Sequence, residues 1–470
     1  MRKTPLMSSD CPTVADLFAG AGGLSLGFHA AGCRIMLAAE ADDQAARTFN
    51  DNFRRLQPES PPIVLGGGAG DLEQLDLANV AMNRSPDILV GGPPCQGFSR
   101  LGRAKLRKLR AQSEKYPAED PRNDLYRRFL AAAELWRPRA VVMENVPGMM
   151  SIDGRDAAET AASELAAVGY RVGFGILNAV WYGVPQYRER LFFVGIRDDL
   201  SVAPALPPAT HRAVLPTGYL RPAPAATLPL SFVRHYELPV DTRAATTAAV
   251  TVSEALDDLP PITEHLSGGH AARGDFRRLT RYCSPAHSHF ARLMRVWPGL
   301  PACDGVFDHV IRRTPRDYET FRRMKPGDRY PEALAIARRR RDEDRELLRA
   351  RGVVLVPGTS EYEKHEKRFV PPYPEHMFLE KWRKLIPEQP SWTVPAHLSK
   401  DVYSHIHHGD QARAISIREA ARLQSFPDAF LFCGNMGDCY RQIGNAVPPL
   451  VGWAIAAAVL RSIGAAGMVP

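Results

Sequence analysis

The sequence predicts an α/β fold in which a parallel sheet is covered by helices on both faces, with a second, smaller domain. The first two hundred residues alternate short apolar runs with segments of helical periodicity, which is typical of strands buried on both faces. Around Ala203 the chain becomes Pro/Ala-rich, and residues 266–390 are basic, aromatic and irregular. Regular patterning returns at residues 417–426 and in an apolar helix after Asn445, which we expect to pack back onto the first domain's sheet.

The apolar runs define the order of the predicted elements. Five of them are predicted strands: Val14–Phe18, Ile35–Ala39, Asp87–Val90, Ala140–Met143 and Leu191–Val194. The segment after the first run has a helical pattern with Leu24, Phe28 and Ala31 on one face. We assign residues 1–262, completed by residues 434–470, to the first domain and residues 263–433, including the Arg418–Pro427 block, to the second. In parallel sheets, ligands bind beyond the carboxyl ends of the strands, so the residues that follow these runs are the candidates for chemistry.

Composition excludes several classes of protein. The chain has 470 residues, of which 45% are hydrophobic and 24% charged, so it is globular rather than disordered. The net charge of +8 favours a polyanionic partner. Seven cysteines without a C-x-x-C pair fit neither a disulfide framework nor a zinc ribbon, and indicate a reduced, intracellular compartment. The polar N-terminus predicts no signal peptide, and the apolar run Val447–Leu460 is too short to span a bilayer.

A glycine-rich turn follows the first predicted strand, in the stretch Asp16–Leu24. Its G-x-G-G spacing is not that of a pyrophosphate cradle, and Glu40 follows Gly20 by twenty positions, where a carboxylate can hold ribose hydroxyls. The pattern favours a pocket for a nucleoside without a pyrophosphate. The alternative is a tight turn whose glycines serve packing.

Cys95 lies in the stretch Gly91–Ser99, after the strand that ends at Val90. The preceding Pro93 and Pro94 fix φ and hold the thiol at the sheet edge. An inert structural cysteine would normally lie inside an apolar element, so this position favours a reactive thiol.

Glu144 directly follows the predicted strand Ala140–Met143, which places a carboxylate at the same edge of the sheet as Cys95. It is a plausible general acid or base there, although a single Glu at a strand end is more often solvated. Strand alternation would aim Arg188 and Arg190 the same way, and guanidinium groups suit phosphate or a base carbonyl. Charge clusters of this kind also commonly face solvent.

These blocks, in this order, resemble the C5-cytosine DNA methyltransferase family of the bacterial restriction-modification type. The matching segments are Asp16–Phe28, Glu40, Asp71–Leu72, Gly91–Ser99, Glu144–Val146, Gln186–Arg190, Arg418–Pro427 and Tyr440–Pro448. The resemblance covers nearly the full chain outside residues 203–390. It implies a Rossmann-like sheet that binds S-adenosyl-L-methionine and a target-recognition domain in the second part of the chain.

The resemblance implies roles for the residues that face the base. The target cytosine is flipped out of the duplex, because its C5 and C6 atoms are unreachable inside the stack. Cys95 attacks C6, and Glu144, sharing or carrying a proton, contacts N3 and the exocyclic amine. Arg190 holds the base's O2, and Arg188 contacts the target or its backbone.

The resemblance also implies the cofactor contacts. Phe18 stacks on the adenine, Glu40 binds the ribose, and Asp71 with Leu72 contacts the adenine edge. The residues expected around the methionine part are Gly20, Gly22, Leu24, Asn445 and Ala446. No metal is expected, since the sequence shows no ligand cluster.

We expect double-stranded DNA as the partner, with a cognate restriction or defence nuclease as a further possibility. The chain is expected to be a cytoplasmic monomer, associated with the nucleoid when bound to DNA, that protects its host in a restriction-modification or phage-defence system. Arg338–Arg341, interleaved with acidic residues, are expected on a solvated helix face.

Three other classes of protein share part of this pattern. A tRNA methyltransferase shares these motifs, but that branch lacks the large insertion between Arg197 and Ser391. A decayed, methyltransferase-like DNA-binding regulator would not be expected to keep Cys95, Glu144 and Glu40. An adenine amino-methyltransferase would need a polar residue before Pro-Pro, where this chain has Gly92.

Overall fold

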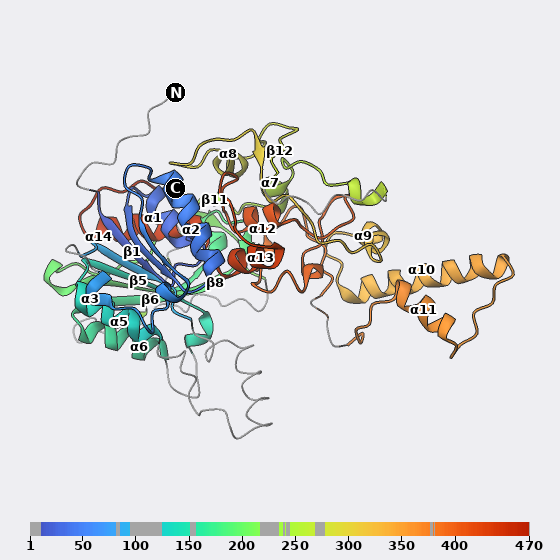
Figure 1. Cartoon of the computed structure of the whole chain (residues 1–470), viewed down its shortest axis with the longest axis horizontal. Coiled ribbons are helices and arrows are strands. Elements are labelled where there is room, and N and C mark those ends of the chain that lie inside the picture. Colours follow the sequence, from blue (N-terminus) through green and yellow to red (C-terminus); the bar gives the residue numbers. More distant parts are fainter. Residues whose placement is uncertain are drawn as a thin grey trace, which may run out of the picture.

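The computed structural model describes residues 11–80, 85–94, 125–150, 157–216, 245–267, 278–376 and 381–469, together with 235–237, 240 and 379. An eight-stranded sheet forms the centre, in the spatial order β10-β6-β8-β5-β4-β1-β2-β3 (Figure 1). Its strands are β1 (Thr13–Leu17), β2 (Arg34–Glu40), β3 (Ile63–Gly66), β4 (Ile88–Gly91), β5 (Ala140–Asn145), β6 (Tyr170–Asn178), β8 (Glu189–Arg197) and β10 (His235–Glu237). Each of the five runs predicted to be a strand falls on one of them, which confirms the α/β class.

Helices cover both faces of this sheet. Val14 belongs to one buried cluster and its neighbour Ala15 to the other, and Val90 and Leu89 alternate in the same way. The first face carries α1 (Gly23–Ala30), α2 (Asp43–Leu56) and α14 (Pro449–Ser462). The second carries α3 (Leu77–Val80), α5 (Leu125–Trp136) and α6 (Ala157–Ala167). Burial on both faces explains why the strands are continuously apolar in sequence.

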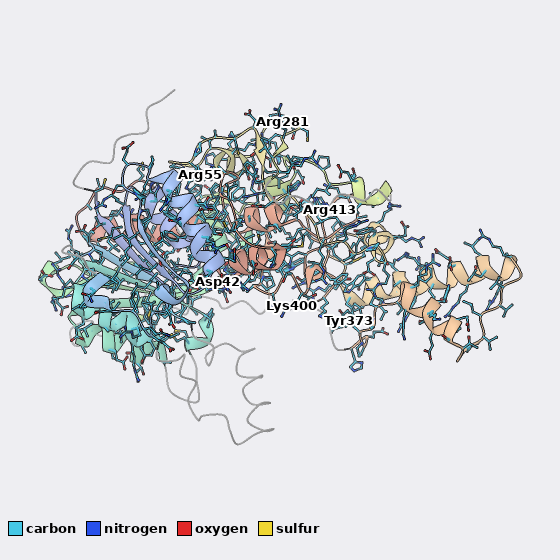
Figure 2. The ribbon with its side chains drawn as sticks, viewed as in Figure 1. Asp42, Arg55, Arg281, Tyr373, Lys400 and Arg413 are labelled. Carbon is cyan, nitrogen blue, oxygen red and sulfur yellow. The ribbon has the colours of Figure 1, made fainter. Side chains whose placement is uncertain are left out.

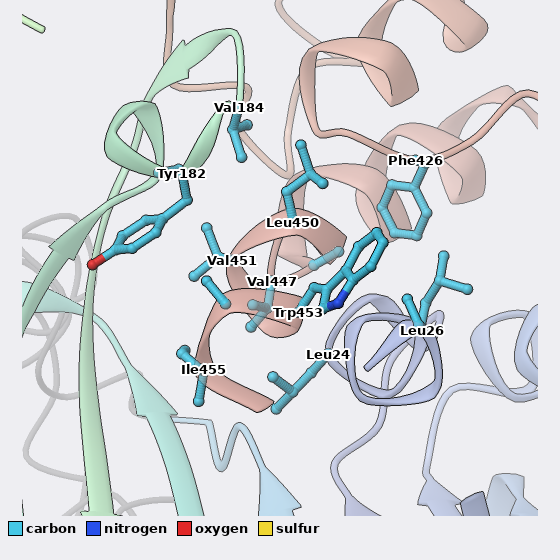
Figure 3. Close-up of a cluster of buried hydrophobic side chains, with 14 of the residues drawn as sticks. Leu24, Leu26, Tyr182, Val184, Phe426, Val447, Leu450, Val451, Trp453 and Ile455 are labelled. Carbon is cyan, nitrogen blue, oxygen red and sulfur yellow. The ribbon is translucent and has the colours of Figure 1, made fainter. Parts of the chain in front are cut away.

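The contact between α1 and α14 depends on a glycine. A Cβ atom on Gly27 would lie 2.3 Å from the backbone nitrogen of Trp453, so any larger residue would force the helices apart. Figure 3 shows Leu24 and Leu26 of α1 beside Trp453, in the cluster to which Phe426 also belongs. The C-terminal helix therefore returns to the first domain, as predicted.

The direction of β8 corrects the prediction of an all-parallel sheet. β8 runs antiparallel to both of its neighbours, β5 and β6. Only residues 179–188 connect β6 to β8, including a 3-10 turn at Ala179–Tyr182 and the two-residue β7 (Gln186–Tyr187). A parallel crossover needs a dozen residues or more, so this short connection requires reversal. As a result, β8 begins at the edge where β5 ends, and Asn145 pairs with Leu191 there.

A separate hydrophobic cluster marks the second part of the chain. It joins α9 (Tyr318–Arg323) and the first half of α10 (Tyr330–Ala350) to Trp382. In Figure 1, α10 and α11 (Ser360–Phe369) form an arm that projects away from the sheet. On α10, Arg338 pairs with Glu375, and Arg341 with Asp342 and Glu366. These partly exposed ion pairs agree with the expected solvated helix face.

The main core extends across the domain boundaries expected from the sequence. α8 (His289–Arg295) and α12 (Ile417–Leu423), both in the predicted second domain, contribute to the same cluster as α1, α14 and α13 (Met436–Asn445) of the predicted first domain. Much of the predicted second domain therefore packs with the first. Besides short 3-10 turns, the remaining described elements are α7 (Val252–Leu256) and three two-stranded pairs: β9 (His211–Arg212) with β11 (Thr247–Ala248), β12 (Thr280–Arg281) with β13 (Gly305–Val306), and β14 (Ser391–Trp392) with β7.

One described helical stretch, Met436–Ser462, is long and apolar enough to cross a membrane by composition. It comprises α13 and α14, and its apolar window is 89% buried inside the protein. The stretch is therefore a core element of the fold.

Candidate active site

A cavity of about 500 Å³ lies at the sheet edge where β1, β2, β4 and β5 end. This volume lies within the range of small-molecule sites. Three distant parts of the sequence meet around it: residues 16–72, the segments at 92–94 and 144–146 with Arg190, and residues 441–447. Most of the predicted site residues line it, namely Phe18, Gly20, Leu24, Glu40, Asp71, Leu72, Glu144, Arg190, Asn445 and Ala446.

The turn after β1 is locked to the end of β2. Phe18 adopts a φ of +61°, which is uncommon for a residue with a side chain, and Gly20 follows at +56°. The Gly20 N–H donates to Oε2 of Glu40 at 2.8 Å, and the Asp42 N–H donates to Oε1 at 2.7 Å. Burial raises the pKa of Glu40, and these two N–H groups oppose that shift. Each oxygen keeps acceptor capacity, so a fixed carboxylate is presented to a ligand in the cavity.

Asp16 is a cavity residue that the sequence pattern alone does not identify. It is 1% exposed, and one of its oxygens accepts a hydrogen bond from the Ser25 hydroxyl at 2.6 Å. The pKa of Asp16 is raised to about 7, mainly by burial; the charge of Glu40 also raises it, and the hydrogen bond from Ser25 lowers it. In sequence this aspartate stands inside an apolar strand run. Its position one strand away from Glu40 becomes visible only when β1 and β2 are paired.

Charged residues from the two ends of the chain meet beside the cavity. Nη2 of Arg441 on α13 lies 2.6 Å from Oδ2 of Asp42, just after β2, and 3.0 Å from Oδ1 of Asp438. Both Arg441 and Asp42 line the cavity (Asp42 is labelled in Figure 2). This ion pair joins the segment of Asn445 to that of Glu40 across the site.

Glu144 and Arg190 form an ion pair in the same cavity. Nε of Arg190 lies 2.8 Å from Oε1 of Glu144, and the two side chains are 20% and 14% exposed. Burial raises the pKa of Glu144, whereas the charges of Arg190 and Arg188 lower it. A buried carboxyl with a raised pKa, oriented by a guanidinium, can exchange a proton with a ligand.

The chain segment that leads to Cys95 lies next to this pair. Gly92, Pro93 and Pro94 line the cavity, and a Cβ on Gly92 would lie 3.1 Å from Oε2 of Glu144. The described chain thus reaches the cavity at the residue before Cys95. Cys95 itself lies outside the described residues.

Two predicted site residues lie elsewhere. Gly22 does not line the cavity, and a Cβ there would lie 2.7 Å from the rings of Phe49 and Phe53, so this glycine serves helix packing. Arg188 does not line the cavity; it is 1% exposed and donates to the backbone carbonyls of Val394, Gly444 and Ala446. The alternation of side chains along one strand predicted that Arg188 and Arg190 point the same way. Arg188 lies between the end of β7 and the start of β8, so the two arginines do not belong to one continuous strand and this alternation does not apply.

The sequence matches the family description "C-5 cytosine-specific DNA methylase" over residues 13–258 and 313–461. The chain belongs to this family. Together with the fold and the cavity, this membership defines it as a methyltransferase of the C5-cytosine class.

Proteins that are similar to this chain are named as methyltransferases. The chain is 37% identical over 457 residues to a candidate type II methyltransferase, M.OihORF3336P, of Oceanobacillus iheyensis, covering 96% of each chain. It is 30% identical over 465 residues to the type II methyltransferase M.AgeI of Thalassovita gelatinovora, covering 94% of this chain and 97% of that protein. A crystal structure of a candidate prophage-encoded DNA modification methyltransferase from E. coli shares the fold, with a TM-score of 0.62, 22% identity and coverage of 96% and 99%.

Proposed function

We propose that this chain transfers a methyl group from S-adenosyl-L-methionine to C5 of a flipped cytosine within a specific sequence of double-stranded DNA. The observation that carries the proposal is the Glu144–Arg190 pair, which lies beside Gly92–Pro94 in the cavity that Glu40 also lines. A carboxyl group suited to a base and a carboxylate suited to a ribose therefore share one site.

The residues around Glu40 fit S-adenosyl-L-methionine, which supplies an electrophilic methyl group when bound. Glu40 would accept hydrogen bonds from the ribose hydroxyls, and Phe18 would stack on the adenine. Asp71 and Leu72 would contact the adenine edge. The residues that would close the methionine end are Gly20, Leu24, Asn445 and Ala446.

On the base side, Cys95 acts as the nucleophile. Its thiolate adds to C6, which pushes electron density into the ring and makes C5 nucleophilic. Glu144, protonated or sharing a proton, neutralises the charge that develops at N3, and Arg190 holds both Glu144 and the base's O2. After methylation, loss of the C5 proton restores the double bond and expels the Cys95 thiolate.

The relatives' names favour a role in host protection. A type II methyltransferase modifies the sites that a nuclease would otherwise cleave, so we infer a restriction-modification or phage-defence setting and a cognate nuclease. We further infer a cytoplasmic monomer that reads its DNA sequence with the segment between α9 and Trp382.

DNA carrying 5-fluorocytosine tests this function, because fluorine at C5 cannot leave as a proton. Wild-type protein with the cofactor should form a denaturant-resistant adduct with such DNA, and Cys95→Ser should form none, since a serine hydroxyl stays protonated. Bisulfite sequencing of genomic DNA from expressing cells should reveal methylation at one sequence. An active Cys95→Ser variant would contradict the proposal.

A further inference from the structure

Arg188 holds the backbone on both sides of Asn445. Its Nη2 donates to the carbonyl oxygens of Gly444 at 2.7 Å and Ala446 at 3.1 Å, and its Nη1 donates to that of Val394 at 3.1 Å. Because Arg188 is 1% exposed, water cannot readily replace these bonds. Asn445, between two of these carbonyls, lines the cavity.

Two of the carbonyls that Arg188 binds, those of Gly444 and Ala446, lie at the C-terminal end of α13. The last carbonyls of a helix lack partners within the helix, and a positive charge there also interacts favourably with the helix dipole. Gln424 binds the same turn: its Nε2 donates to the carbonyls of Ile443 at 2.6 Å and Ala446 at 3.2 Å. Two side chains from different parts of the sequence thus fix the backbone that carries Asn445.

The segment of Arg188 also reaches the base side of the cavity. Arg190, two residues further on, pairs with Glu144. The Gln186 amide, two residues earlier, donates to Oε1 of Gln424 at 2.6 Å and accepts from the Val394 N–H at 2.8 Å. Residues 186–190 therefore join the two halves of the cavity.

Resting on the proposed function, we propose that Arg188 is a positioning residue that fixes Asn445 at the cofactor end of the cavity and thereby sets the affinity for S-adenosyl-L-methionine. It acts on the cofactor through backbone, and does not contact DNA. Arg188 and Arg190 are only two residues apart in sequence, but Arg188 positions Asn445 whereas Arg190 contacts Glu144.

The test compares full-length Arg188→Gln, Arg188→Lys and Gln424→Leu with wild type. Arg171→Gln serves as the matched control, because Arg171 is a partly exposed arginine on β6 that faces Asp198. The measurements are S-adenosyl-L-methionine Kd by calorimetry, DNA Kd, melting temperature, and kcat at saturating cofactor.

Arg188→Gln should raise the cofactor Kd about tenfold or more, since it removes charge-assisted hydrogen bonds that hold the turn. DNA Kd should stay within about twofold, and saturating cofactor should restore most of kcat. Arg188→Lys keeps the charge but loses the guanidinium fork, so its cofactor Kd should be intermediate.

Gln424→Leu should raise the cofactor Kd in the same direction, which keeps the test decisive if Arg188→Gln does not fold. If Arg188→Gln lowered the melting temperature but left the cofactor Kd unchanged, Arg188 would stabilise only the fold, and the inference would be overturned. Weakened DNA binding with an unchanged cofactor Kd would also overturn it, in favour of a DNA contact. If wild-type protein failed to bind the cofactor, the proposed function itself would be wrong, which is a separate result.

Discussion

Arg190 contacts Glu144 because of the register between two antiparallel strands. Glu144 of β5 pairs with Phe192 of β8, and Arg190 lies two residues from Phe192 on the same face of the sheet. The resulting separation of 2.8 Å between Arg190 Nε and Glu144 Oε1 follows from this diagonal neighbourhood. A one-residue slip would place the guanidinium on the opposite face.

Glu144→Gln should lower the rate of methyl transfer by about 10² or more, the usual size of an acid–base contribution. The amide cannot supply or share the proton that compensates charge in the base. Cofactor binding should hardly change, because Glu40 lies on the other side of the cavity. Single-turnover kinetics and calorimetry measure the two quantities, and a variant that lost cofactor binding but methylated normally at saturation would contradict these roles.

Arg190→Gln should move the pH dependence of the reaction. Burial raises the pKa of Glu144, and the charge of Arg190 opposes that shift, so removing the charge should raise this pKa further. If protonated Glu144 is needed, the rate falls as pH rises through its pKa, and the alkaline limb of the single-turnover profile should move to higher pH in the variant. The overall rate should be lower at every pH. An unshifted alkaline limb would show that another group sets it.

Asp16→Asn should make stability less sensitive to pH. The pKa of Asp16 is raised to about 7 from an ordinary value near 4, so the folded state binds its proton more tightly than the unfolded state. The contribution of Asp16 to the free energy of unfolding is therefore fully present at low pH, and it is lost as the pH rises from about 4 to 7. The asparagine variant should lack this loss, which is expected to be a few kcal/mol at most. Denaturant unfolding at pH 5 and pH 8 measures it.

Ser25→Ala is the matched control for Asp16. The Ser25 hydroxyl lowers the pKa of Asp16, so its removal should raise that pKa and deepen the loss of stability at pH 8. Equal unfolding free energies at the two pH values in wild type would contradict the assignment.

Exchanging part of the chain with a relative should separate DNA recognition from cofactor binding only if the exchanged segment leaves the main hydrophobic core intact. Replacing residues 313–384 with a relative's segment should keep cofactor binding and alter the methylated sequence, because groove contacts supply selectivity. Replacing residues 266–390 would also remove Phe290, Met294 and Trp297 from the main core and should prevent folding. Bisulfite sequencing and thermal unfolding measure the outcomes. A folded 313–384 chimera that methylates the original sequence would place recognition elsewhere.

Sequence patterns predicted the elements better than their directions. Strands buried on both faces are continuously apolar, so β1, β2, β4 and β5 were recognisable, whereas nothing in the run Leu191–Val194 records that β8 is reversed. The short connection after β6 was the available signal, but β6 itself, with two glycines in its nine residues, was not predicted.

The same limit applies to individual site residues. Glu40 and Glu144 lie at the carboxyl ends of parallel strands. Because ligands bind at that edge of a parallel sheet, their location in the site could be predicted from the sequence. The partners of Arg188 are carbonyls more than 200 positions away, so its role depends on tertiary packing that local spacing does not encode.

The cavity draws residues from both ends of the sequence, and this has a consequence during synthesis. A ribosome delivers Phe18 and Glu40 first, but Arg441 and Asn445 only after nearly the whole chain has emerged. Until α14 is made, the face of α1 that it covers has no native partner, and a chaperone could bind it. A nascent or prematurely terminated chain would thus hold the segment of Cys95, the proposed nucleophile, without a finished cavity, so we expect methylation only from molecules translated at least through Val447.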